Sequence, residues 1–417
     1  MREPWFSKMA KLRTDPDNMT KKQITVRTIL FIAAVVIAVS AFSIGVVKIG
    51  EKKEGYYTVE TSPEEEALTY ANDFSLEYYC TGESNEIKQL LNELGSFYSG
   101  ALNRAYKLLD PATEYNGYVN LASVNNALGK EITVSDELFD VLTDAWEKTE
   151  EQQGFNLFGG ILYDEWQSLL ILEHPEEFDP LNNPDTADRI RAAAARTASL
   201  SHFSFRVTDE KTHTVCLSVD DAYASFLAEN DFTAPVVTTG LLHDAYVLRI
   251  VRSALEKEGY HNGYLTSKSG LTVSLSEHEA GEYCLYALSN GEAVEAAALP
   301  VGKNTACQLF RAFPMSEGAI GYYSPDGKHL RHGYYIAGDG TFVDVIASAI
   351  AVSASGDPVE ACYFMIRLNQ CTAVEDAAAL INASDLLVVY SLQSVPGKVY
   401  CSPAAEAKLR ILRPEFE

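Results

Sequence analysis

Basic residues are scarce in this 417-residue chain: 33 Lys and Arg stand against 58 Asp and Glu, which gives a formal net charge of −25 at pH 7. The first fifty residues carry eight basic and only three acidic residues, so the remainder carries about −30. So acidic a domain repels a nucleic-acid backbone, and no basic stripe offsets its charge. The composition therefore argues against a nucleic-acid partner, and the acidity favours a soluble surface.

Paired cysteine motifs are also missing. The seven cysteines are scattered along the chain and none forms a C-x-x-C pair. This spacing gives no support to a zinc ribbon or a thioredoxin-like motif. An odd number leaves at least one cysteine unpaired within a monomer, and most are expected to be small buried apolar residues. The spacing assigns no disulfide.

Long apolar runs are absent except for one, residues 28–47, which contains no charge. A helix of this length spans a hydrocarbon core of ~30 Å. Seven basic residues precede it, which predicts a cytoplasmic N-terminus and an extracytoplasmic C-terminal domain. The alternative is a cleaved signal peptide with a small-residue site at Val39-Ser40-Ala41. Because the run continues to Val47, an uncleaved anchor in the cell membrane is favoured.

The chain then divides into four predicted parts: a cytoplasmic basic segment (1–27), a transmembrane helix (28–47), a juxtamembrane linker (48–66) and an extracytoplasmic domain (67–417). In the last part, helices and strands are segregated, which is typical of an α+β fold. Ser135 and Asp185 are expected helix caps. Helical spacing covers 86–109, 241–255 and 375–383, and strand patterns cover 203–207, 214–219, 271–275, 283–288, 293–298 and 386–391. The stretch 342–352 is compatible with a strand or a buried helix.

The most informative stretch is 235–270. A short apolar run, expected to be a strand, meets Gly240, and a helix pattern follows up to a C-cap glycine at Gly259. A second apolar stretch ends at Ser269-Gly270. A strand that leads through a glycine into a helix N-terminus is a usual way to place backbone N–H groups against a phosphate. An ordinary strand–helix–strand unit has the same pattern, so this stretch alone does not decide the function.

The succession of landmarks resembles the ApbE family, the FAD:protein FMN transferases. Members carry K-G-x-x-x-D at a helix start, where this chain has Thr239-Gly240-Leu241-Leu242-His243-Asp244, with the lysine replaced. Ser269-Gly270 stands in the place of a later G-G pair, and the stretch 154–166 in the place of a Gly- and Trp-containing motif. Asp326-Gly327 matches a turn before His332, but the H-x-x-D-P-x-T-G motif that the family has there is absent.

The resemblance implies the ApbE-like fold and a membrane-anchored, extracytoplasmic protein that transfers FMN from FAD to a threonine or serine of a partner protein with Mg²⁺. The metal neutralises diphosphate charge and orients the attack in such chemistry. The acceptor implied is an extracytoplasmic flavoprotein. Because several chemical residues differ, weak or absent activity is also expected.

Site residues follow from the same resemblance. His332 is the candidate catalytic residue, and the metal candidate is Glu360, in the first place of a D-x-x-x-T pair whose second place holds Phe364. Phenylalanine cannot ligate a hard cation, so the metal site looks damaged. The flavin-binding candidates are Asn125, Thr239, Gly240, Asp244, Ser269 and Gly270.

Plainer interpretations stay open for several of these residues. His332 can be a turn histidine, Asp244 a first-turn carboxylate favoured by the helix dipole, and Asn125 a loop-forming residue. At the level of the whole chain, the rivals to an enzyme are a non-catalytic flavin-binding or scaffold protein on the cell surface, and an unrelated acidic domain. Binding of FAD by the domain, with and without Mg²⁺, separates these possibilities.

Overall fold

The computed structural model describes residues 52–62, 71–275, 281–300, 302–313, 321–342 and 344–416. The predicted basic segment and membrane helix lie outside these residues. Among the helices that are described, none is both long and apolar enough to span a membrane. The described chain forms two units, of which one holds residues 52–54 and Thr81–Lys88, and the other Gly55–Cys80 and the chain from Gln89 onward. Everything below concerns the second unit.

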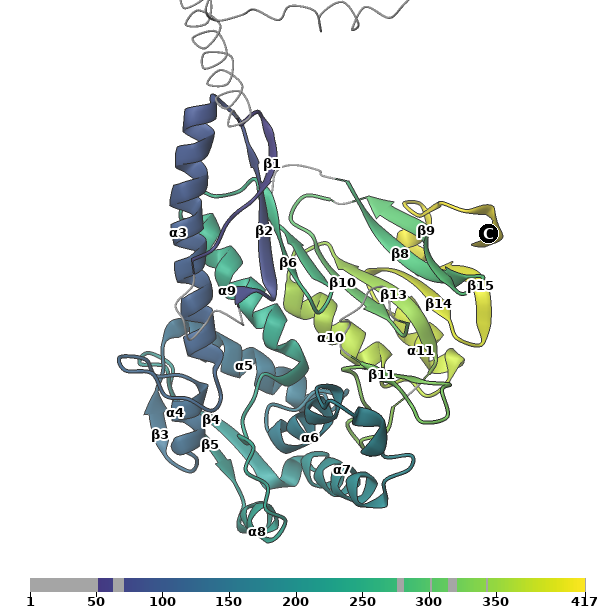
Figure 1. Ribbon diagram of the computed structural model, residues 1–417. Helices are drawn as coiled ribbons and strands as arrows, with labels where there is room; N and C mark the ends of the chain where they lie inside the picture. The colour runs from purple at the N-terminus through teal and green to yellow at the C-terminus, as the bar shows by residue number, and fades with distance from the viewer. Residues whose placement is uncertain are drawn as a thin grey trace, which may run out of the picture. The chain divides into compact units, whose positions relative to one another are not determined.

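An eight-stranded sheet forms the centre of this unit (Figure 1). Every pair of neighbouring strands in it is antiparallel, so the chain combines helices with an antiparallel sheet, as the sequence predicts. In spatial order the strands are β1 (Gly55–Thr58), β2 (Phe74–Cys80), β6 (Gly263–Ser267), β7 (Leu271–Ser274), β10 (Ala306–Arg311), β13 (Ile346–Ser353), β14 (Leu387–Leu392) and β15 (Val395–Cys401).

Both faces of the sheet are buried around β13. Ala349 and Ala351 pack with Phe364 and Met365 of α10 (Pro358–Leu368) on one face. Ile350 and Val352, which alternate with these alanines, pack on the other face against a second, three-stranded sheet. Its strands are β16 (Arg410–Ile411), β9 (Glu292–Pro300) and β8 (Glu282–Ser289). Because alternate side chains of a strand point to opposite faces, one strand serves two cores. The helices α9 (His243–Lys257) and α11 (Val374–Asn382) lie on the same side as α10.

Nine further elements form a helical part with a small sheet, whose strands lie in the order β3-β5-β4. Aromatic rings join them: Phe158 stacks on Phe203 with centroids 4.8 Å apart, and Trp146 meets Phe158 edge-on. Its elements are α3 (Ser84–Leu109), α4 (Leu121–Asn126), β3 (Glu131–Thr133), α5 (Asp136–Glu150), α6 (Gly160–Leu170), α7 (Pro184–Thr197), β4 (Phe203–Asp209), β5 (Thr214–Val219) and α8 (Asp221–Glu229).

Most predicted elements are present within one or two residues. Ser135 caps α5, with its hydroxyl accepting from the Leu138 N–H. The ambiguous stretch 342–352 is resolved as β13, a buried strand with helix-side and sheet-side residues in alternation. None of the seven cysteines forms a disulfide, and four of them are buried: Cys80, Cys216, Cys307 and Cys362.

Two local expectations were wrong. The cap of α7 is Asn183, whose side chain accepts from the Thr186 N–H, because Pro184 occupies the first helical position and Asp185 falls inside the first turn. The run before Gly240 is not a strand. Its backbone is paired instead with the side chain of Asn125 at Val237 and with the Leu157 carbonyl at Thr238.

A buried ion pair ties the loop at Asp179 to the short strand β12 (Leu330–Arg331). Arg331 donates to both carboxylate oxygens of Asp179 at 2.7 and 3.0 Å, and the Tyr322 hydroxyl donates to the same carboxylate. The Asp179 side chain is fully buried and that of Arg331 is 9% exposed. Burial by itself raises the pKa of the Asp179 carboxyl, but hydrogen bonds and the Arg331 charge outweigh it and lower the pKa.

Replacing Arg331 by methionine should destabilise the domain strongly, because it leaves the buried Asp179 carboxylate without its partner. The expected loss in the free energy of unfolding is about 3–5 kcal/mol. Urea titration followed by circular dichroism measures it. Arg191→Met is the control, since Arg191 pairs with Asp188 on the surface, where both side chains are mostly exposed. Equal stability of the two variants would contradict the role given to the buried pair.

Candidate functional site

A cavity of about 210 Å³ lies beside the start of α9. Its walls come from segments far apart in the sequence: the loop before α6, α6 itself, the Gly240 turn, the loop 335–338 and the end of α10. The residues that line it are Thr149, Gln152, Gln153, Gly154, Phe155, Asn156, Gly159, Leu162, Tyr163, Thr197, Ala198, Leu200, Thr238, Gly240, Leu241, Tyr335, Ala337, Gly338 and Gln370. Aromatic rings and uncharged polar groups therefore form its surface.

The Gly240 turn is the part of the cavity that the sequence identifies. A short 3₁₀ turn, Gly240–Leu242, leads into α9. Gly240 has φ +48°, a left-handed conformation that favours glycine, and its N–H donates to the Thr238 hydroxyl at 3.1 Å. A Cβ at this position would lie 3.6 Å from the ring of Tyr163, so that ring lies directly over the turn.

Thr239 and Asp244, two neighbours of Gly240, do not line the cavity. Thr239 is buried, and its hydroxyl lies 2.9 Å from Nδ1 of His243. Asp244 is half-buried in the first turn of α9 and has no hydrogen bond or ion pair with any described residue. Its carboxylate nevertheless acts at a distance, because burial and the Asp244 charge together raise the pKa of the Tyr163 hydroxyl to about 12. Asp244 therefore brings negative charge to the cavity's edge.

Asn125 positions the segment that leads to Gly240. Its side-chain amide accepts from the Val237 N–H at 2.8 Å and donates to the Val237 carbonyl at 2.9 Å. The same amide also bonds the carbonyls of Pro111 and Leu121. Since these backbone groups take up its hydrogen-bonding capacity, Asn125 shapes the cavity from behind and does not line it.

Ser269 and Gly270 form the turn between β6 and β7. Gly270 has φ +93°, and a Cβ there would lie 2.7 Å from the Leu309 carbonyl of β10. The Leu309 N–H donates to Gly270, and the Gln308 amide donates to Ser269. The pair is thus held against the neighbouring strand, which accounts for the glycine by close packing. Neither residue lines the cavity.

His332 is buried among aromatic rings, with Phe310 edge-on at 5.0 Å. Its Nδ1 accepts from the Tyr334 N–H, so the proton of the neutral ring is on Nε2, which has no partner among the described residues. Burial, with Arg331 beside it, lowers the pKa of His332 to about 4. The ring is therefore neutral at pH 7. Tyr335, three residues further along the chain, does line the cavity.

The depressed pKa of His332 predicts an acid-sensitive contribution to stability. The unfolded chain takes up this proton near pH 6.5 and the folded chain only near pH 4, so acid favours the unfolded chain. Between these pH values the free energy of unfolding of the wild type should fall by about 3 kcal/mol more than that of His332→Asn. The asparagine amide keeps an acceptor for the Tyr334 N–H.

Urea titrations of both proteins from pH 7 to pH 4 measure this difference. His174→Asn removes an exposed histidine and should follow the wild-type profile. Parallel profiles for wild type and His332→Asn would show that burial does not hold His332 neutral.

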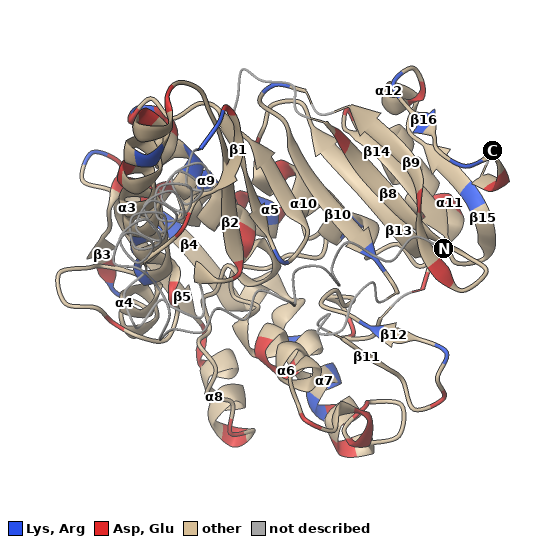
Figure 2. Ribbon diagram, turned by 45° about the horizontal axis from the view of Figure 1, so that its top comes forward, with Lys and Arg blue, Asp and Glu red and all other residues tan. Residues whose placement is uncertain are grey.

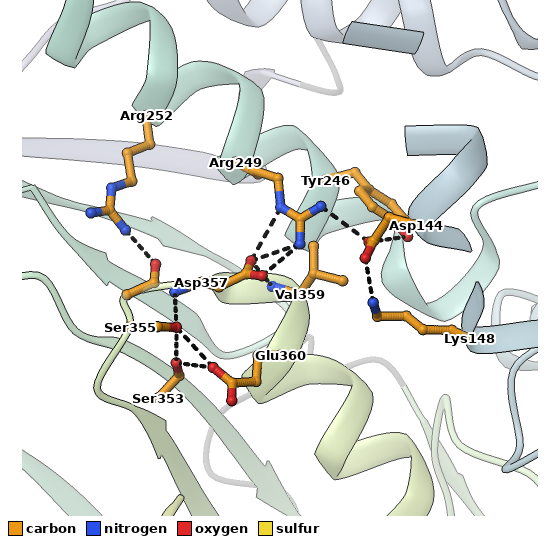
Figure 3. Close-up of polar contacts among 11 residues, drawn as sticks. Asp144, Lys148, Tyr246, Arg249, Arg252, Ser353, Ser355, Asp357, Val359 and Glu360 are labelled. Carbon is orange, nitrogen blue, oxygen red and sulfur yellow. Dashed lines mark hydrogen bonds and ion pairs between the residues drawn. The ribbon is translucent and has the colours of Figure 1, made fainter. Parts of the chain in front are cut away.

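Glu360 points away from the Gly240 turn. The hydroxyls of Ser353 and Ser355 both donate to its Oε2 (Figure 3). On the other side of α10, the Cys362 thiol donates to the Leu241 carbonyl. Residues two positions apart in an α-helix are separated by about 160° around its axis, so Glu360 and Cys362 lie on nearly opposite sides.

The residues present do not fit a hard divalent cation at this helix. Two positions of α10, one helical turn apart, face the Gly240 turn. Pro358 has no ligand atom in its side chain, and burial and Asp244 raise the pKa of the Cys362 thiol. Phe364 lies in the hydrophobic core. No group of three acidic, histidine or cysteine side chains suited to a metal occurs among the described residues. Mg²⁺ requires oxygen ligands, and neither of these two side chains supplies one.

An ion-pair network fixes the helices around the cavity (Figure 3). Arg249 of α9 donates to Asp357, the cap of α10, and to Asp144 of α5. Asp144 also accepts from Tyr246 and Lys148. Burial by itself raises the pKa of the Asp144 carboxyl, but Arg249 and Lys148 outweigh it and lower the pKa. These charges are satisfied by one another.

Among the residues predicted from the sequence, Gly240 lines the cavity. The others do not line it: Asn125, Thr239, Asp244, Ser269, Gly270, His332 and Glu360. The sequence reasoning missed Tyr163, Tyr335 and Gln370. Tyr163 lies in the glycine-rich stretch that the resemblance marked. Gln370 bonds the backbone of Tyr335 and Ala337 and packs on Gly154, contacts that leave no local signal.

Comparison with known proteins identifies the fold. No protein-family model and no curated protein sequence matches this chain. Solved structures do match. The flavinyl transferase ApbE of Pseudomonas stutzeri has a TM-score of 0.53 at 13% identity, over 86% of this chain and 97% of that one. The ApbE protein of Thermotoga maritima has a TM-score of 0.57 at 12% identity, over 85% and 99%. The chain has the fold of the ApbE flavin transferases.

Proposed function

We propose that this chain is a non-catalytic flavin-binding protein built on the flavin-transferase fold. The observation that carries the proposal is the side of α10 that faces the Gly240 turn, where neither the Pro358 nor the Cys362 side chain offers an oxygen ligand for Mg²⁺. Without a metal to neutralise the diphosphate, transfer of FMN from FAD loses its main electrostatic support. A cavity beside that turn remains available for binding.

The cavity suits a planar aromatic ring. Tyr163, Tyr335 and Phe155 offer ring surfaces, while Gln152 and Gln153 offer amide groups at its edge. Such a combination is typical of small-molecule sites, which are largely apolar with a few polar groups. Its volume of about 210 Å³ is below the usual ~300–1,000 Å³ of pockets for drug-sized ligands, so it accommodates a ring system better than a whole dinucleotide.

Flavin binding is tested by titrating the domain with riboflavin, FMN and FAD and following flavin fluorescence. At least one flavin should bind, with the same affinity in Mg²⁺ and in a chelator, and FAD should release no AMP at an ordinary enzymatic rate of about 1 s⁻¹. Metal-dependent release of AMP at that rate would instead establish a transferase and overturn the proposal.

A matched pair of glycine variants tests the location. Gly338 is at the cavity wall, has no neighbouring atom within 4 Å of an added Cβ and has ordinary backbone angles. Gly338→Phe should therefore fill the cavity and weaken flavin binding at least about tenfold. Gly100→Phe, at an equally open glycine of α3 away from the cavity, is the control. Unchanged affinity in Gly338→Phe would place the flavin elsewhere.

We also propose that residues 28–47 anchor the protein in the cell membrane with the flavin-binding domain outside, where it meets an extracytoplasmic flavoprotein. The apolar run and its basic flank support this topology. Protease added to intact cells should then digest the C-terminal domain. A domain that becomes sensitive only after the membrane is permeabilised would lie inside the cell, contrary to the proposal.

A further inference from the structure

A second hollow, of about 260 Å³, adjoins the cavity at the C-terminal end of α10. Gln153 and Gln370 line both spaces, so the hollow and the cavity are neighbours. The other walls of the hollow come from the end of α10, the start of α11 and the loop between them. Taken together, the volumes of the two spaces fall within the ~300–1,000 Å³ that is usual for small-molecule sites.

Arg367 is the one basic residue among the described residues that line the cavity and the hollow. Basic side chains are few in this chain and lie scattered along the ribbon (Figure 2). Those of Arg249 and Arg331 are paired with aspartates. The Arg367 guanidinium has no ion pair or hydrogen bond with any residue that the structure describes, and its Nε is buried. A buried donor without a partner is costly and commonly marks the place of a bound water or ion.

The Tyr363 ring backs this guanidinium. The Cζ of Arg367 lies 5.8 Å from the centre of the ring, and the Tyr363 hydroxyl is itself held by the Lys148 carbonyl and the Glu151 carboxylate. Packing on a fixed ring restricts the guanidinium without using its hydrogen bonds. Because the N–H groups of arginine form a planar fork, they match the paired oxygens of a phosphate.

The start of α11 opens onto the same hollow. Its cap residue is Ala373, whose side chain cannot accept from the first N–H groups of the helix, and Thr372 in front of it lines the hollow. The partial positive charge of this helix start adds to the charge of Arg367. Asp376 of the first turn opposes an anion, but its side chain is exposed, so water screens its charge.

We infer that this hollow is a phosphate subsite and that FMN is the flavin held by the two spaces. This inference rests on the proposed flavin-binding function. The ring system occupies the cavity, the ribityl chain passes Gln153 and Gln370, and the terminal phosphate accepts hydrogen bonds from Arg367. Riboflavin has no phosphate and leaves the arginine unpaired. The subsite lies at the opposite end of α10 from Glu360, the metal candidate, so it is separate from the place that the resemblance gives to a metal.

Isothermal titration of the purified protein with riboflavin and FMN tests the phosphate contact. FMN should bind at least about tenfold more tightly than riboflavin, and Arg367→Gln should remove this difference without changing the affinity for riboflavin. Arg367→Lys keeps the charge without the planar fork and should give an intermediate affinity. Arg413→Gln, at an exposed arginine that follows β16, is the control.

The outcomes separate the inference from the proposed function. Equal affinities of the wild type for riboflavin and FMN would overturn the inference and leave the proposed function standing. Binding of neither flavin would overturn both. Thermal melts check that the variants are folded. Asp376→Asn changes an exposed side chain and should raise the affinity for FMN alone, since it removes the opposing charge. An unchanged FMN affinity in that variant would place the phosphate outside the hollow.

Alkylation of Cys371 reports on the location. Cys371 lines the hollow and is half-buried, as are Cys284 on β8 and Cys401 on β15, which serve as internal controls. Saturating FMN should slow the reaction of Cys371 with iodoacetamide several-fold and leave the other two rates unchanged, as measured by peptide mass spectrometry. No protection of Cys371 would overturn the inference. Inorganic phosphate that protects as strongly as FMN at equal concentration would identify a site for a free anion and overturn the assignment of FMN.

Discussion

The Arg249 guanidinium is the interaction on which the arrangement of this site depends. It joins Asp357 at the start of α10 to Asp144 of α5, positions that lie 108 and 105 residues away in the sequence. Burial alone lowers the pKa of an arginine, but the two carboxylates outweigh it and raise the pKa of Arg249 further. Removing Arg249 leaves the Asp357 carboxylate without an ion-pair partner, so this one residue holds the three helices together.

This constraint decides which way α10 faces. With Asp357 held by Arg249, the helix presents Cys362 to the Gly240 turn and Glu360 to two serine hydroxyls. The face of α10 nearest the turn therefore carries an apolar residue and a thiol. The Glu360 carboxylate is hydrogen-bonded to the serine hydroxyls on the other side of the helix. A cavity built by aromatic and amide groups follows, and charge is excluded from its walls although the surface around it is acidic.

Much of the fold was predictable from local pattern. Helical spacing located α3, α5, α9 and α11, and alternating residues located β4, β5, β8 and β14, because these periodicities reflect which face is buried. Gly240 was also predictable as a special backbone position. The run before it was misread as a strand, since an extended segment pinned by Asn125 has the same apolar sequence as a strand paired with a neighbour.

The sequence by itself determined the acidic charge, the apolar run at 28–47, the order of the elements and the presence of an uncharged threonine at position 239. Only the tertiary structure decided which side chains meet. Tyr163, Tyr335 and Gln370 converge from three separate segments, and the roles of Asn125 and Glu360 depend on partners chosen by packing. The physical reason is range. Periodicity and capping act over one or two helical turns, whereas the cavity is made by contacts between residues from 35 (Gln370 and Tyr335) to 112 (Asn125 and Val237) positions apart.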